Sequence, residues 1–87
     1  MTVAQQVFRI LEQITRTPEV SRRPDIALYE LQLLDSLSTV ELILALSREF
    51  GLEISPAEFD RDEWSTPQRI VEDVEARLAR RQAGARA

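Results

Sequence analysis

The sequence predicts an all-α protein, a small four-helix bundle with three longer helices and one short one. Apolar residues recur at helical spacing in three separate segments, prolines and a glycine mark the ends of these segments, and no segment alternates apolar and polar residues as a strand does. The chain of 87 residues makes one domain, whose single core buries about 60 to 65% of the surface of the unfolded chain.

The first helix is predicted to run from Val3 to about Arg16. Its apolar side consists of Val3, Val7, Ile10, Leu11 and Ile14. Pro18 ends the helix because proline has no amide hydrogen and pushes the preceding residue out of the helical region. The connection up to Asp35 is rich in apolar residues, namely Ile26, Leu28, Leu31, Leu33 and Leu34. We therefore expect this connection to lie against the core, with room for one helical turn.

The second helix is predicted from Ser36 or Leu37 to Phe50, and Gly51 ends it because a residue without a Cβ readily takes the left-handed conformation that closes helices. On a helical wheel two apolar groups point in opposite directions. The larger group is Leu42, Ile43, Leu46 and Phe50, and the smaller is Leu37, Val40 and Leu44. We expect the larger group to face the core. The smaller group then faces either a partner or the preceding connection, and its charged neighbours Glu41 and Arg48 favour a partner.

Two proline-marked helix starts follow Gly51. Ser55-Pro56-Ala57-Glu58 has a capping serine, a first-turn proline and a glutamate three residues after the cap, which predicts a short third helix. Thr66-Pro67 begins the last helix, with Ile70, Val74 and Leu78 on one face. Trp64 is expected to pack inside and fix the approach of that helix. The domain is predicted to cover residues 1–81, and residues 82–87 to form a disordered tail.

The composition argues against an enzyme and against a metal centre. The chain has no cysteine and no histidine, so it lacks thiolate nucleophiles, the usual zinc ligands and the side chain that most often moves protons near neutral pH. The first residues contain no basic stretch that leads into an apolar run, and no segment approaches the roughly 18 apolar residues that cross a membrane. We expect a soluble, cytoplasmic protein.

The net charge of −4 is unevenly distributed. Residues 36–76 carry ten acids and three arginines, whereas residues 77–87 carry four arginines and no acid. An acidic middle disfavours nucleic acid, whose phosphates need cations, and favours partners that present Arg or Lys.

Leu33-Leu34-Asp35-Ser36-Leu37, at the start of the second helix, resembles the attachment motif of acyl and peptidyl carrier proteins. The resemblance implies an acyl-carrier-like bundle in which Ser36 carries a covalent 4'-phosphopantetheine arm. It also implies that Asp35 holds the magnesium-bearing active site of the phosphopantetheinyl transferase. A helix N-terminus favours the phosphodiester of such an arm. The alternative is that Asp35 and Ser36 form an N-cap and nothing more.

Further segments extend the resemblance over nearly the whole chain, to the D-alanyl carrier proteins. These segments are Thr39-Val40-Glu41-Leu42, Phe50-Gly51, Glu58-Phe59-Asp60-Arg61, Glu63-Trp64 and Thr66-Pro67. The resemblance implies a monomeric carrier that an adenylating amino acid ligase loads with D-alanine as a thioester, for delivery to a membrane-bound acyltransferase. It also implies that Leu37, Val40, Glu41 and Leu44 form the partner face. The reactive thiol belongs to the arm, so no side chain of the protein needs to act as acid or base.

Two departures and two alternatives accompany this interpretation. Members of the family usually have glycine at the position of Gln32, which must therefore adopt the backbone conformation of that glycine. Members also commonly have more acidic residues before this position than the segment from Pro24 to Glu30 supplies. In addition, all eleven basic residues are arginine, a composition that leaves open a different amino acid and a different final acceptor. The alternatives are a stand-alone carrier for polyketide or nonribosomal synthesis, and a cofactor-free helical docking module in which Ser36 stays unmodified.

Overall fold

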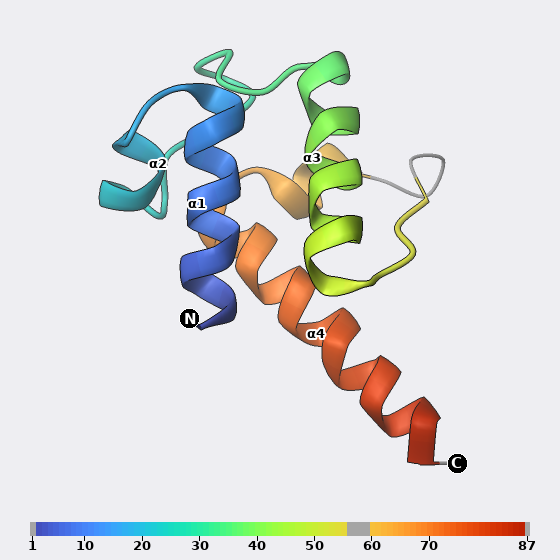
Figure 1. Ribbon diagram of the computed structural model, residues 1–87. Coiled ribbons are helices and arrows are strands. Elements are labelled where there is room, and N and C mark those ends of the chain that lie inside the picture. Colours follow the sequence, from blue (N-terminus) through green and yellow to red (C-terminus); the bar gives the residue numbers. More distant parts are fainter. Residues whose placement is uncertain (1, 56–59, 87) are drawn as a thin grey trace.

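The computed structural model describes residues 2–55 and 60–86. Its elements follow in the order α1 (Val3–Thr15), α2 (Glu19–Arg22), α3 (Ser36–Phe50), the 3-10 helix η2 (Arg61–Trp64) and α4 (Pro67–Arg86). Within these residues there is no strand, and three of the α-helices are long, so the predicted all-α bundle is confirmed. Figure 1 shows α1 and α3 side by side and α4 crossing below them, with its C-terminal part extending beyond the bundle.

Helix α1 begins and ends close to the predicted residues. Thr2 caps it, because its hydroxyl accepts the backbone N–H of Gln5 while the Gln5 side chain accepts the N–H of Thr2. It ends at Thr15, and Arg16 follows in the left-handed conformation, with φ of 60°. Its apolar side supplies Val7, Ile10 and Leu11 to the core.

The connection between α1 and α3 packs against the core, as its apolar content predicted. It contains one helical turn, α2, and it buries Ile26, Leu28 and Leu34. Two amides in the connection, those of residues 33 and 34, donate to the carbonyl of Leu28, whose own amide donates to Ser65. Leu31 is the exception to the prediction, because it is 55% exposed.

Gln32 takes the left-handed backbone conformation, with φ of 60°. The left-handed conformation destabilises the folded state by about 1 to 2 kcal/mol when the residue has a Cβ. Glycine avoids this strain, but its greater freedom in the unfolded chain costs about 0.5 to 1 kcal/mol of stability. Because the side chain is exposed, a substitution removes little packing. We expect Gln32→Gly to raise the melting temperature by a few degrees, measured by circular dichroism. Gln32→Val should lower it, and a fall with glycine would contradict this account.

The two faces of α3 lie as the helical wheel predicts. Leu42, Ile43 and Leu46 are buried, and Phe50 is half-buried against them. On the opposite side the exposed fractions are 71% for Leu37, 40% for Val40 and 54% for Leu44. The preceding connection therefore leaves this second face open. The helix ends at Gly51, with φ of 64°, as predicted.

The region between α3 and α4 differs in part from the prediction. The predicted short helix at Ser55 to Glu58 falls mostly on residues 56–59, which lie outside the described residues. The short helical element that the structure describes is η2, which begins after Asp60, whose carboxylate accepts the amide of Asp62 at 2.9 Å. Trp64 at its end is 1% exposed, which confirms its packing role.

Helix α4 begins at Pro67, as predicted, and the Thr66 hydroxyl accepts the amide of Arg69 at 3.2 Å. It continues to Arg86, so residues 82–86 have helical backbone where the sequence analysis expected a disordered tail. Alanine, arginine and glutamine dominate this segment, and all three favour the helix. The domain boundary at residue 81 stays a prediction.

Candidate functional site

The N-terminus of α3 is built around a reciprocal cap. Asp35 is the N-cap residue, and its Oδ1 accepts the backbone N–H of Ser38 at 2.8 Å. The amide of Asp35 in turn donates to the Ser38 hydroxyl oxygen at 2.8 Å. Two backbone groups at the start of the helix are thereby satisfied, which fixes where the helix begins. The capping role expected of Asp35 is thus present. Capping does not prevent the exposed carboxylate from taking part in arm attachment as well.

A second set of hydrogen bonds ties the preceding connection to α3. The Thr39 hydroxyl lies 2.6 Å from the carbonyl oxygen of Asp35, to which it donates, and 2.6 Å from the hydroxyl of Tyr29. Thr39 is 5% exposed. Because a buried hydroxyl needs its partners, these bonds hold the connection and the first turn of the helix in one arrangement.

Ser36 is the first residue of α3 and its side chain is exposed. It follows the capping Asp35, so it lies at the positive end of the helix dipole, where an anion is stabilised. An exposed hydroxyl at this position can be reached by a modifying enzyme, and a phosphodiester formed on it would remain in solvent beside the helix terminus. The residues present therefore fit a phosphate-linked arm.

The exposed apolar stripe begins one residue after Ser36. It consists of Leu37, Val40 and Leu44, and its neighbours Glu41 and Arg48 are also exposed. The stripe and Ser36 are on the same helix. A protein that contacts the stripe is therefore held at a fixed distance from Ser36 and in a fixed orientation. The structure thus brings together all six residues that the sequence analysis singled out.

Sequence reasoning missed the residues that support the site: Tyr29, Ser38 and Thr39. Ser38 could have been found, since a hydroxyl three residues after a capping aspartate is a signal for a reciprocal cap. Tyr29 lies ten residues from Thr39 in an irregular segment, and no local pattern indicates their contact.

The residues that the structure describes contain no group of three or more potential metal-ligating side chains. In residues 2–55 and 60–86, every helix is too short or too polar to cross a membrane.

A capped helix with an exposed serine at its first position, in a small helical bundle, is the arrangement expected of a carrier domain. Comparison with known proteins agrees: residues 5–74 match the family model described as a phosphopantetheine attachment site. The D-alanyl carrier protein of Enterococcus faecalis is 43% identical over 76 residues, which is 87% of this chain and 97% of the relative. That of Bacillus velezensis is 44% identical over 71 residues, 82% of this chain and 91% of the relative.

The chain belongs to the D-alanyl carrier protein family of phosphopantetheine-attachment domains. The predictions of a carrier in place of an enzyme, and of covalent 4'-phosphopantetheine as its cofactor, are thereby confirmed. Membership also implies a transferase that attaches the arm and a ligase that loads it.

Proposed function

We propose that Ser36 carries the 4'-phosphopantetheine arm and that the protein holds D-alanine on it as a thioester. The observation that carries this proposal is the exposed position of Ser36 at the start of α3, inside the segment that matches the attachment-site model. The names of the relatives support D-alanine as the loaded group.

The residues around Ser36 have distinct roles in arm attachment. The Ser36 hydroxyl oxygen forms the new bond to phosphorus, its proton is lost, and adenosine 3',5'-bisphosphate leaves from coenzyme A. Asp35, exposed beside it, contributes a carboxylate to the magnesium-bearing site of the transferase. The arm supplies the thiol that forms the thioester. The dipole of α3 stabilises the charge of the resulting phosphodiester.

The stripe of Leu37, Val40 and Leu44 serves as the docking face for the enzymes that act on the arm. Its apolar side chains lose water on contact, and Glu41 at the rim attracts a basic group of the partner. The same face must meet the transferase, the ligase and a membrane-bound acyltransferase in turn, which requires that it stay open in a monomer. Because these steps consume coenzyme A and ATP, the proposed function is one that takes place in the cytoplasm.

The loaded group is tested by offering the holo protein the candidate ligase, ATP and a panel of amino and fatty acids. We expect a mass increment that corresponds to alanine, with D-alanine preferred over L-alanine, and we expect hydroxylamine to remove it because it cleaves thioesters. Intact mass spectrometry measures both. Loading by fatty or aryl acids alone would replace this function with that of a general acyl carrier.

A further inference from the structure

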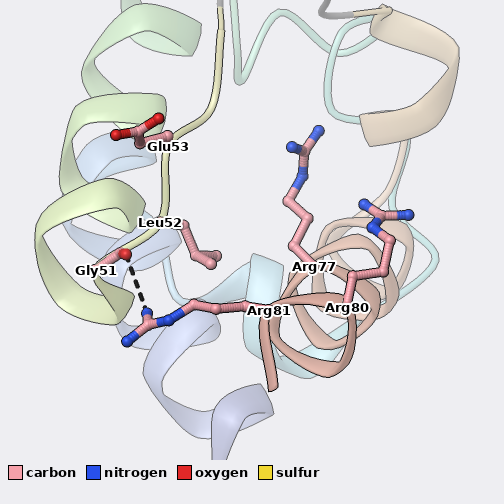
Figure 2. Close-up of a pocket in the computed structure, with 6 residues that line it drawn as sticks. All are labelled: Gly51, Leu52, Glu53, Arg77, Arg80 and Arg81. Carbon is pink, nitrogen blue, oxygen red and sulfur yellow. Dashed lines mark hydrogen bonds between the residues drawn. The ribbon is translucent and has the colours of Figure 1, made fainter. Parts of the chain in front are cut away.

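An open groove lies where the loop after α3 meets the C-terminal half of α4 (Figure 2). Its volume is about 400 Å³. The loop contributes Gly51, Leu52 and Glu53, and α4 contributes Arg77, Arg80 and Arg81. Three arginines of α4 thus line one concave surface, opposite the loop that follows α3. Leu52, which is 8% exposed, adds an apolar contact to this lining.

Arg81 is held in place by the end of α3. Its Nη1 donates to the carbonyl oxygens of Phe50 and Gly51, at 2.8 and 3.0 Å. These carbonyls belong to the C-terminal end of the helix, where the helix dipole favours a cation. Arg81 therefore joins α4 to α3, and it has N–H groups beyond the two bonds of Nη1.

Arg77 is held in place by the packing of η2 on α4. Its Nε donates to Oδ2 of Asp73 at 3.0 Å, and the same oxygen accepts the indole N–H of the buried Trp64 at 2.8 Å. Side chains that are already ordered lose little entropy when they bind a ligand. Arg77 and Arg81 thus form a preorganised pair of donors.

Arg80 supplies a charge that the folded protein does not compensate. It is exposed, and among the residues that the structure describes it forms no hydrogen bond and no ion pair. Figure 2 shows Arg77 and Arg80 extending from α4 in the same general direction, while Arg81 runs toward Gly51 and the Glu53 carboxylate points away from the arginines. An anion that enters from solvent therefore meets two neighbouring guanidinium groups.

The charge of this region is opposite to that of the rest of the chain. Residues 77–87 carry +4, whereas the chain as a whole carries −4. The match to the attachment-site model ends at residue 74, before the first of the three arginines. The groove is thus a basic area on an acidic protein, and its three arginines lie beyond the segment that matches the family model.

We propose that this groove binds an acidic peptide segment of a partner protein, with carboxylates of the segment on Arg77, Arg80 and Arg81. Arginine clusters are a recurrent means of recognising acidic motifs. The concave shape and the Leu52 contact favour a discrete segment over a flat anionic membrane surface. The proposal goes beyond the function proposed above, because arm attachment does not require the groove.

The test uses the full chain, labelled with nitrogen-15, and a glutamate-rich peptide that is blocked at both ends. We expect saturable shifts of the amide signals of Gly51 and Leu52 and of the Nε signals of the three arginines. Arg80→Glu should weaken binding about tenfold. Binding should also vanish at about 1 M salt, where the Debye length is about 3 Å.

Arg23→Glu is the matched control, since it makes the same charge change at an exposed arginine after α2. It should weaken binding less than about twofold. Ser36→Ala should bind the peptide like the parent, which separates the groove from the arm. Equal losses with Arg23→Glu and Arg80→Glu, absence of saturable shifts at the groove, or preferential binding to phosphatidylglycerol vesicles would each overturn the proposal.

Discussion

Ser36→Ala is expected to abolish attachment of the arm while leaving the fold intact. The side chain is exposed and stands at the first position of α3, where alanine is well tolerated, so the melting temperature should change by no more than a few degrees. After incubation with coenzyme A and a phosphopantetheinyl transferase, the parent should gain the mass of one arm. The variant should gain none, as measured by intact mass spectrometry.

Ser38→Ala supplies the matched control, because its hydroxyl lies in the same turn and is bonded to Asp35. Loss of this bond weakens the cap by about 1 kcal/mol, and the arm should still be attached to Ser36. Attachment that persists in Ser36→Ala, or that is lost in Ser38→Ala alone, would show that the acceptor is another residue.

The bounds of α3 and the division of its faces were predictable because both depend on local signals. Asp35 and Gly51 act on the backbone within one turn, and the apolar pattern between them repeats with the helical period. The position of Ser36 relative to the exposed stripe follows from the same geometry. The essential parts of the candidate site were therefore present in one continuous segment, from Asp35 to Gly51.

Features that depend on contacts between distant segments were not predictable. The Tyr29 hydroxyl contacts the Thr39 hydroxyl from an irregular loop. Arg81 donates to two carbonyl oxygens at the end of α3 that lie 30 and 31 residues earlier in the chain. The helical period of the apolar residues gives no information on such pairs. The exposure of Leu31 was also unpredictable from the local sequence. The backbone hydrogen bonds to Leu28 set the path of the loop, and this path determines that Leu31 faces solvent.

The largest difference in stability is expected between the two faces of α3. Leu46 is 0% exposed, and Leu46→Ala removes core volume at a cost of about 2 to 5 kcal/mol. In a domain of this size such a loss lowers the melting temperature by about 10 °C or more. Leu44 is 54% exposed on the opposite side, so Leu44→Asp should change the melting temperature by only a few degrees.

Substitutions on the exposed face of α3 should slow loading more than a substitution on the buried face, because the ligase is proposed to dock on the exposed stripe. Leu44→Asp and Val40→Asp place a charge in an apolar contact and should slow aminoacyl transfer from the ligase, whereas folded Leu46→Ala should load at nearly the parental rate. Glu41→Lys should also slow transfer, and less so at high salt, since a rim charge is screened over about 10 Å at 0.1 M. The melting temperature of each variant is measured first, and its loading rate is then measured below that temperature. Together the two values show whether a substitution acts on stability or on docking. Normal loading of both aspartate variants would place the docking face elsewhere on the carrier.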